Sequence, residues 1–345
     1  MEKEALDIGG FIRDNVENHT SDIVAFVAET FSFSRQRAYE YVTREIKAGN
    51  VIKVGSRRWT RYFLVGGRKI QFSTNITSGE TSEDRVWTKF IKPMIVKYPE
   101  NIIRICAFAF TEIFNNAIDH SGGTSIYTDF EIKDGEINIG IMDNGVGIFQ
   151  KIQAALHLES KREAILHLSK GKFTTDPSKH TGEGIFFTSR MLNSFSISSD
   201  DMFYTFEGND WFLGRERPES FGRGTYIKMM LSTTSKLAPK DIFDRYRDRE
   251  IGFGKTIVAV ALSADPGDPH VSRSQAKRLL VGLEKFKRVI LDFKGVESVG
   301  QAFVDEVFRV FKNEHPSIHI HYFNTTDEVD SMIKRGLAEN SSSRG

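Results

Sequence analysis

The chain has 345 residues, of which 27% are charged and 39% hydrophobic, and its formal net charge is +1. This length suits two or three domains, and the composition is that of an ordinary soluble globular protein. The near-equal numbers of basic and acidic residues exclude a histone-like cation and an acidic tail protein. The single cysteine excludes an intramolecular disulfide and a cysteine-based zinc site. With no signal peptide and no apolar run long enough to span a bilayer, we expect a cytoplasmic protein without a membrane partner.

The small net charge conceals two opposed regions near the start of the chain. Residues 1–34 carry 2 basic and 7 acidic side chains, whereas residues 35–69 carry 10 basic and 2 acidic side chains. Nucleic acid requires one cationic face, so the second region is the candidate for binding it.

The basic region follows a pattern of three short helices and a two-stranded hairpin. The helices are expected at Glu4–Val16, Ile23–Phe31 and Arg35–Lys47, and the strands at Val51–Val54 and Trp59–Val65. Ser34 is a suitable N-cap for the third helix. This order predicts a winged helix, in which the third helix lies in the major groove of DNA.

The residues expected to contact DNA lie on the third helix and on the hairpin. They are Arg35, Gln36, Arg37, Tyr41 and Arg44 on the helix, and Arg57, Arg58 and Arg61 on the hairpin. The hairpin arginines would meet phosphates or the minor groove. The alternative is a winged helix that contacts proteins and has only a solvated basic face.

The central region begins with a largely buried helix over residues 102–120, in which apolar residues recur at helical spacing. Glu112 and Asn116 interrupt this pattern and share one face. A carboxylate and an amide are costly to bury without partners. A site that needs a general base and an oxygen ligand for Mg²⁺ would explain both.

Glycine-rich turns follow this helix. Strands are expected at Ser125–Ile132 and Ile137–Met142, and the second leads into Asp143-Asn144-Gly145-Val146-Gly147, where glycines let a ligand approach the backbone. Residues 171–184 form a polar loop with lysines, and they lead into a helix whose N-terminus could hold phosphate. Gly224-Thr225 then opens a strand over residues 226–231. The intervening segment Lys151–Lys170 reads as one amphipathic helix, with its histidines, His157 and His167, at surface positions.

Taken in order, these pieces resemble the GHKL ATPase family, the fold of histidine kinases, gyrase, Hsp90 and MutL. The matching motifs are the N-box from Glu112 to His120, the Asp-x-Gly-x-Gly box from Asp143 to Gly147, the lid stretch Phe173–Thr175 leading to Gly182-x-Gly184, and the strand start Gly224-Thr225. The branch most similar to this chain is that of the anti-sigma-factor serine kinases. A histidine-bearing dimerisation hairpin is absent before the N-box, so autophosphorylation on such a hairpin is not expected.

The resemblance implies a site for ATP and Mg²⁺. It assigns Asn116 to Mg²⁺ and Glu112 to the role of general base, and it makes Asp143 the acceptor of the adenine amino group with help from Thr225. Gly145 and Gly147 would shape the adenine pocket. The residues expected to cover the phosphates are Lys172, Lys179, Gly182 and Gly184. His120 is expected to be a polar neighbour of the ligand rather than a phosphoacceptor.

The C-terminal region alternates strands and helices, which predicts an α/β sandwich. Its stretch LDFKGVESVGQAFVDEVF resembles the STAS-like domains, relatives of anti-sigma-factor antagonists. Phosphorylatable antagonists carry a serine at the start of the helix after this strand, whereas this chain has Gln301 there and Ser298 three residues earlier. That departure argues against a regulatory phosphoserine. The domain either serves dimerisation and packing or contacts the ATPase domain of the same chain.

The sequence therefore predicts a multidomain α/β protein. The expected domains are a winged helix over 1–69, a GHKL domain over 70–235, a linker over 236–250, a STAS-like domain over 251–338 and a disordered tail over 339–345. The leading hypothesis is a regulator in which ATP and Mg²⁺ control DNA binding through the STAS-like domain. The alternatives are a protein serine/threonine kinase and an ATP-dependent protein-interaction module without DNA binding. A regulatory protein partner and a homodimer both remain open.

Overall fold

The computed structural model of the chain describes residues 7–173, 181–208, 210–214, 223–248, 252–264 and 270–342. Contacts divide the chain into two compact units, each built from two segments. The sheet unit comprises Met1–Val146 and Leu192–Lys236, and the C-terminal unit comprises Gly147–Met191 and Leu237–Gly345. The segment between Gly147 and Met191, which the sequence places inside the central domain, thus belongs with the C-terminal residues.

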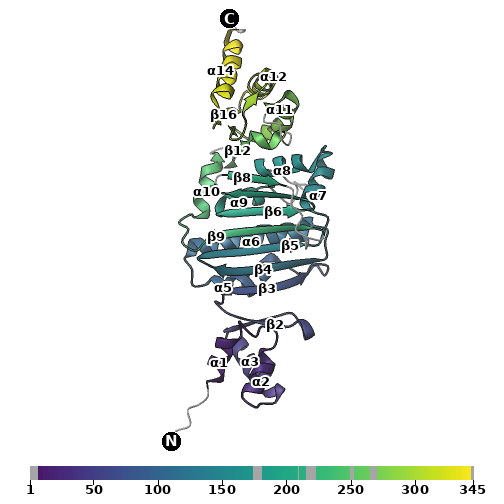
Figure 1. Cartoon of the computed structure of the whole chain (residues 1–345), viewed down its shortest axis with the longest axis vertical. Helices are drawn as coiled ribbons and strands as arrows, with labels where there is room; N and C mark the ends of the chain where they lie inside the picture. Colours follow the sequence, from purple (N-terminus) through teal and green to yellow (C-terminus); the bar gives the residue numbers. More distant parts are fainter. Residues whose placement is uncertain are drawn as a thin grey trace. The chain divides into compact units, whose positions relative to one another are not determined.

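The first part of the sheet unit consists of three helices and a hairpin (Figure 1). Its elements are α1 (Ile8–Asn15), α2 (Ile23–Thr30), α3 (Arg35–Lys47), β1 (Val51–Val54), the single turn η1 (Arg57–Trp59) and β2 (Arg61–Leu64). The Ser34 side chain accepts the N–H of Arg37 at 3.2 Å, so it caps α3 as the sequence predicts. Strands β1 and β2 pair antiparallel, and Ile12, Val27 and Val42 lie in the core that the helices share.

A seven-stranded antiparallel sheet forms the main part of this unit (Figure 1). Its strands are β3 (Lys69–Asn75), β4 (Ser125–Lys133), β5 (Glu136–Asp143), β6 (Ser194–Ser199), β7 (Met202–Glu207), β8 (Asp210–Gly214) and β9 (Thr225–Ser232). The order across the sheet is β3-β4-β5-β9-β6-β7-β8. Strand β9 therefore lies between β5 and β6, and it brings Thr225 beside the end of β5.

Helices cover one face of this sheet. They are α4 (Glu83–Val86), η2 (Trp87–Ile91), α5 (Lys92–Ile95) and α6 (Glu100–His120). Helix α6 packs against β4, β5 and β9, and Phe110, Phe114 and Ala117 are buried on its inner side. Strand residues alternate between buried and partly exposed positions, as expected for a sheet with one covered face.

The C-terminal unit combines the inserted helices with a small parallel sheet. The elements of the insert are α7 (Ile148–Leu156), α8 (Lys161–Lys170) and α9 (Gly184–Met191). The remaining helices and turns are α10 (Pro239–Tyr246), η3 (Val260–Ser263), α11 (Arg273–Leu280), η4 (Leu283–Lys285), α12 (Gln301–Asp305), η5 (Glu306–Val310), α13 (Phe311–Glu314) and α14 (Asp327–Ser342). The strands are β10 (Arg247–Asp248), β11 (Gly252–Phe253), β12 (Lys255–Ala259), β13 (His270–Val271), β14 (Arg288–Asp292), β15 (Ser298–Val299) and β16 (His319–Phe323).

Strands β12, β14 and β16 pair in parallel, with β14 in the middle, and helices connect them in the manner of an α/β domain. The predicted α/β class and multidomain organisation are confirmed at this level. The single helix expected over residues 151–170 is two helices, because His157 takes a left-handed conformation at the end of α7 and Ser160 caps α8. Within the described ranges, no helix is both long and apolar enough to cross a bilayer.

Candidate functional site

The carboxylate of Asp143, at the end of the central strand β5, is buried and only 6% exposed. Its Oδ1 accepts the backbone N–H of Gly145 at 2.9 Å and the backbone N–H of Thr225 at 3.3 Å. Burial raises the pKa of Asp143, and these hydrogen bonds oppose the rise. Three residues that the sequence singles out separately, Asp143, Gly145 and Thr225, are thus brought together by the pairing of β5 with β9.

Close backbone packing around Asp143 explains two of the glycines. A Cβ on Gly145 would lie 2.1 Å from the carbonyl oxygen of Ser121, and a Cβ on Gly224 would lie 2.0 Å from that of Asp143. Gly224 also has φ +119°, which other residues rarely adopt. The hydroxyl of Ser199 donates to the Gly224 carbonyl at 3.0 Å. The loop after β5 and the start of β9 are therefore held in one arrangement around the carboxylate.

Asn144 connects this loop to the start of β4, and Val146 connects it to the residue that follows helix α6. Its Oδ1 accepts the N–H groups of Thr124 at 2.8 Å and Ser125 at 3.1 Å, and the N–H of Val146 donates to Ser121 at 3.0 Å. Sequence reasoning missed Asn144 as a positioning residue, although an asparagine in a strand-end turn is a common signal for such bonds.

Glu112 and Asn116 are both half-buried and lie one turn apart on α6, the helix that packs on β5 and β9. Their common face is the one predicted from their spacing. His120, one further turn along, is also half-buried, whereas Asp119 is exposed. The sheet unit therefore holds Glu112, Asn116, Asp143, Gly145 and Thr225.

The remaining predicted ligand residues belong to the C-terminal unit. Gly147, with φ +97°, precedes α7, and Gly184 begins α9. A Cβ on Gly182 would lie 2.3 Å from the carbonyl oxygen of Phe173, so these two residues are in close contact. Lys179 lies outside the described residues.

Lys172 makes its described contacts within the C-terminal unit. Its ammonium donates to the Lys285 carbonyl at 3.0 Å and lies 5.5 Å and 5.0 Å from the ring centroids of Phe253 and Phe286. Burial lowers the pKa of Lys172, and the charge of Glu183 opposes this. Phe253 also packs against Phe186 of α9, at 4.6 Å between ring centroids, so aromatic contacts join the insert to the C-terminal residues.

Lys170 is a buried lysine that sequence reasoning missed, since the end of a charged helix usually faces solvent. It is 2% exposed, and its Nζ donates to the carbonyls of Arg278 at 3.1 Å and Val281 at 2.8 Å, at the end of α11. Burial lowers its pKa to about 7. The Thr256 hydroxyl donates to the Lys170 carbonyl at 2.7 Å. The side chain thus satisfies carbonyls that the helix end leaves without partners.

His167 lies on the same helix and is 9% exposed, so the expectation of a surface position is wrong for this residue. Burial is the main cause that lowers its pKa to about 4, with smaller contributions from the charges of Lys170 and Lys285. His157 is exposed, as expected.

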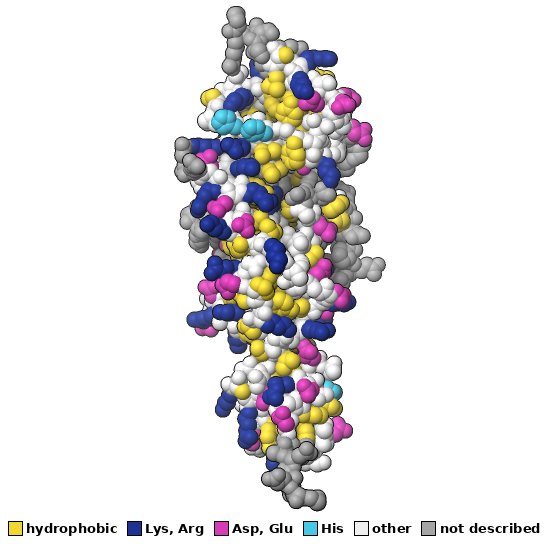
Figure 2. Space-filling model, turned by 90° about the vertical axis from the view of Figure 1, so that its left-hand side faces the viewer, with side chains coloured by type: hydrophobic (Ala, Val, Ile, Leu, Met, Phe, Trp, Pro, Cys, Tyr) yellow, Lys and Arg dark blue, Asp and Glu magenta, His cyan; other side chains and the backbone are white. Residues whose placement is uncertain are grey.

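Of the residues predicted to contact DNA, two arginines of α3 lie over aromatic rings. Arg37 stacks on Phe33 with 4.3 Å to the ring centroid, and Arg44 stacks on Tyr41 at 5.0 Å. The other residues of the set are Arg35 and Gln36, exposed at the start of α3, and Arg57, Arg58 and Arg61 at the hairpin tip and on β2. In the lowest part of Figure 2, Lys and Arg side chains lie at the left edge and also near the centre, where they are interspersed with Asp and Glu side chains.

Comparison with known families assigns one part of the chain. Residues 275–330 match the family described as "STAS-like domain of unknown function (DUF4325)". The match runs from within α11 to within α14, so the predicted STAS-like C-terminal domain is confirmed. Gln301 is exposed and begins α12, the position where the sequence comparison placed it. No curated protein matches the chain.

Proposed function

We propose that this chain is a regulator that binds ATP and Mg²⁺ in its central domain and uses the nucleotide state to control DNA binding by its N-terminal domain, with the STAS-like domain as intermediary. The observation that carries the proposal is the buried carboxylate of Asp143, held by the N–H groups of Gly145 and Thr225 beside α6. A buried carboxylate is costly, and such groups gather at functional sites.

The donor set of the sheet unit suits these ligands. Asp143 would accept the amino group of adenine, and Thr225 would support it, while Gly145 holds the turn beside the carboxylate. Gly147, at the start of the C-terminal unit, would help to shape the adenine pocket. The amide oxygen of Asn116 is a ligand type that Mg²⁺ prefers. Glu112, one turn before it, would act as the general base toward a water or a hydroxyl. When bound, ATP with Mg²⁺ would supply a transferable phosphoryl group.

On the C-terminal unit, Lys172, Lys179, Gly182 and Gly184 are the candidates for contacting phosphate. An ammonium has three N–H donors, so Lys172 would either add a phosphate oxygen to the Lys285 carbonyl or exchange the one for the other. This exchange gives the STAS-like domain a direct connection to the nucleotide state. A ligand shifts such an equilibrium only through its different affinity for the two states.

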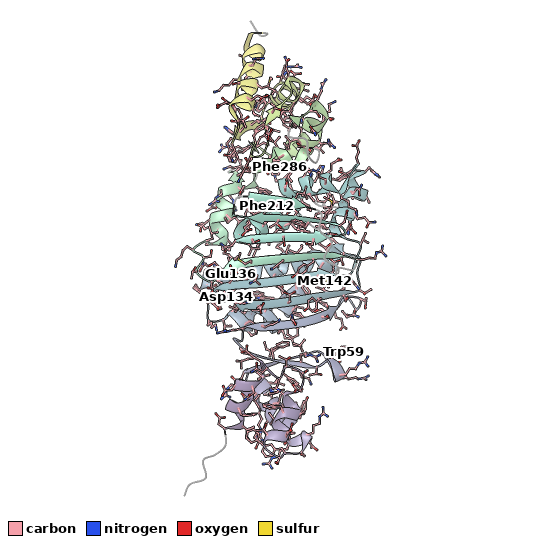
Figure 3. All side chains as sticks on the ribbon, viewed as in Figure 1. Trp59, Asp134, Glu136, Met142, Phe212 and Phe286 are labelled. Carbon is pink, nitrogen blue, oxygen red and sulfur yellow. The ribbon has the colours of Figure 1, made fainter. Side chains whose placement is uncertain are left out.

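Calorimetric titration of the full chain with ATP and Mg²⁺ tests the central claim. We expect Asp143→Asn to weaken ATP binding by at least about ten-fold, a loss of roughly 1.4 kcal/mol, and Asn116→Ala to weaken binding only when Mg²⁺ is present. Asp134→Asn is the matched control. Asp134 is exposed in the turn between β4 and β5, and Met142, the residue before Asp143, lies at the opposite end of this strand pair (Figure 3). Absence of nucleotide binding by the wild-type chain would contradict the proposal.

A second candidate is a protein serine/threonine kinase, favoured by Glu112 because a nucleotide sensor needs no base. Incubation with γ-labelled ATP and Mg²⁺ separates the two. Label on protein that disappears in Glu112→Ala supports the kinase, and free phosphate without labelled protein supports the regulator.

DNA binding is the second half of the proposal, and its support is the cationic character of residues 35–69. We expect binding to duplex DNA to weaken steeply as salt rises, because bound counterions are released. A triple substitution of Arg35, Arg37 and Arg44 by alanine should weaken DNA binding relative to the wild-type chain at the same salt concentration. Binding that ignores salt, or survives the triple substitution unchanged, would favour the third candidate, a protein-interaction module without DNA binding.

A further inference from the structure

The tip of the β1–β2 hairpin carries an exposed indole. Trp59 is 67% exposed, the highest value among the large hydrophobic side chains of the described residues (Figure 3). The tip that presents it is well defined, since the N–H of Trp59 donates to Ser56 at 3.1 Å and the N–H of Thr60 donates to Arg57 at 3.2 Å. Gly55 has φ +75°, and a Cβ there would lie 2.4 Å from the Trp59 carbonyl oxygen.

The surroundings of this indole are cationic. The guanidinium of Arg58 lies 5.1 Å from the Trp59 ring centroid, and Arg57 and Arg58 are both exposed. The sequence contains no acidic residue between positions 46 and 69. The flat indole ring therefore lies beside two permanent positive charges. Such a surface is complementary to a polyanion that also presents apolar groups, and duplex DNA does so, with base pairs between two phosphate chains.

A contact between helix and hairpin extends this surface onto α3. The ammonium of Lys53 on β1 donates to the hydroxyl of Tyr39 at 3.1 Å, and Tyr39 is 42% exposed. This hydrogen bond lowers the pKa of Tyr39. Arg35 lies four residues before Tyr39, so both are on the side of α3 that meets the hairpin.

We propose that Trp59 enters the minor groove of duplex DNA as an apolar wedge while Arg57 and Arg58 reach phosphates on its two sides, and that Tyr39 and Arg35 continue the same contact surface. The proposal rests on the proposed DNA binding and adds a residue that directly contacts bases. Side chains that insert between base steps pay for unstacking through the wider contact that the bent duplex allows.

The first experiment follows the emission of Trp59 itself. In the full chain with Trp87→Phe and Trp211→Phe, Trp59 is the remaining tryptophan. Addition of an unlabelled 30-base-pair duplex should quench the emission of Trp59 and protect the indole from quenching by acrylamide. Unchanged emission and unchanged acrylamide quenching at saturating duplex would overturn the proposal, provided that anisotropy of a labelled duplex confirms binding by the same double variant.

The second experiment measures affinity for the labelled duplex. We expect Trp59→Ala to weaken binding by about ten-fold, as loss of an aromatic contact to bases does, and Trp59→Phe to retain part of the affinity. Phe212→Ala is the control for removal of an exposed aromatic side chain, because Phe212 is 53% exposed on β8. Lys47→Ala is the control for loss of one exposed charge on α3, to be compared with Arg58→Ala.

The outcomes distinguish a failure of the role proposed for Trp59 from a failure of the proposed DNA binding. If the wild-type chain binds no duplex in a salt-dependent way, the proposed DNA binding fails. If it binds and Trp59→Ala equals wild type, only the role of Trp59 fails. Tighter binding to single-stranded than to duplex DNA would overturn the minor-groove wedge in favour of stacking on unpaired bases, and protection of Trp59 from acrylamide in the absence of DNA would overturn it in favour of a protein contact.

Discussion

The surroundings of Asp143 and the helical insert over residues 147–191 are both proposed to serve one nucleotide, yet they are built differently. Asp143 is fixed by its neighbours at Gly145 and by a strand partner at Thr225. The insert is fixed by residues about a hundred positions later, because Lys170 donates to Arg278 and Val281 and Lys172 donates to Lys285. The part proposed for the base is intrinsic to the sheet, and the part proposed for the phosphates is shared with the STAS-like domain.

This difference teaches that a segment can belong by its contacts to one unit while its sequence motifs continue those of the other. The glycine motifs keep their order along the chain, whereas contacts assign residues 147–191 to the C-terminal unit. The variants below test whether the two regions behave as separate stability units.

The largest effect is expected at Gly224, where an added Cβ would meet the Asp143 carbonyl oxygen at 2.0 Å in a conformation with φ +119°. Gly224→Ala should lower the free energy of unfolding by about 3 kcal/mol or more, as measured by urea denaturation. Gly208→Ala is the matched control, since Gly208 has φ +62° and nothing within 4 Å of its Cβ position. It should cost about 1 kcal/mol. Equal losses would show that the packing around Asp143 is not tight.

Lys170→Met should cost about 2 kcal/mol, because it leaves the Arg278 and Val281 carbonyls without their donor while it removes a buried charge. Hydrogen exchange should accelerate in α8 together with α11 and not in β4 and β5. Lys277→Met, at an exposed position of α11, is the control. Acceleration of α8 in step with the sheet strands would break the distinction between the two regions.

The acid sensitivity of the C-terminal unit should depend on His167. Burial lowers its pKa to about 4 from an ordinary value of 6.5, so the folded state favours the neutral ring. Its contribution to stability is complete above pH 6.5 and is lost as the pH falls toward 4. His167→Gln should reduce the slope of unfolding free energy in this window by at most about 1.4 kcal/mol per pH unit. His157→Gln, at an exposed position of the same insert, is the matched control.

The smallest effect is expected at Asn144. Asn144→Ala removes the acceptor for the N–H groups of Thr124 and Ser125 and should cost about 1 kcal/mol. Thr124→Val, which removes only the hydroxyl that accepts from Asn144 Nδ2 at 2.9 Å, should cost less. ATP binding should also fall with Asn144→Ala if these hydrogen bonds hold the loop after β5, and with it Asp143, in the position proposed for binding adenine.

Local signals predicted much of this fold. The third helix, with its serine cap, begins and ends where the sequence indicates, and the apolar pattern of α6 and the alternation in β4 and β5 give those elements within about two residues. Asp143 and Gly145 were also predictable as neighbours, because a strand end followed by glycines is a local pattern, whereas only the family resemblance linked Thr225 to them.

What depends on distant partners was not predictable. Strands β6, β7 and β8 were overlooked because serines and a polar turn obscure their alternation, and their pairing beside β9 is a long-range choice. Lys170 and His167 read as surface residues of an amphipathic helix, but α8 packs against α7, η3 and β12, and both side chains are buried. A sequence window contains no information on a partner a hundred residues away.

The interrupted layout of the C-terminal unit also bears on how the protein forms on the ribosome. Phe186 is made well before Phe253, its partner ring at 4.6 Å, and Lys172 before Phe286. At usual synthesis rates the insert waits on the order of ten seconds for these partners. Meanwhile β5 can already pair with β4, and β9 is made before Phe253, so the strands of the sheet unit are complete first. A nascent chain therefore exposes the side chains that α8 and α9 bury in the folded protein until Phe253 and Phe286 have been made.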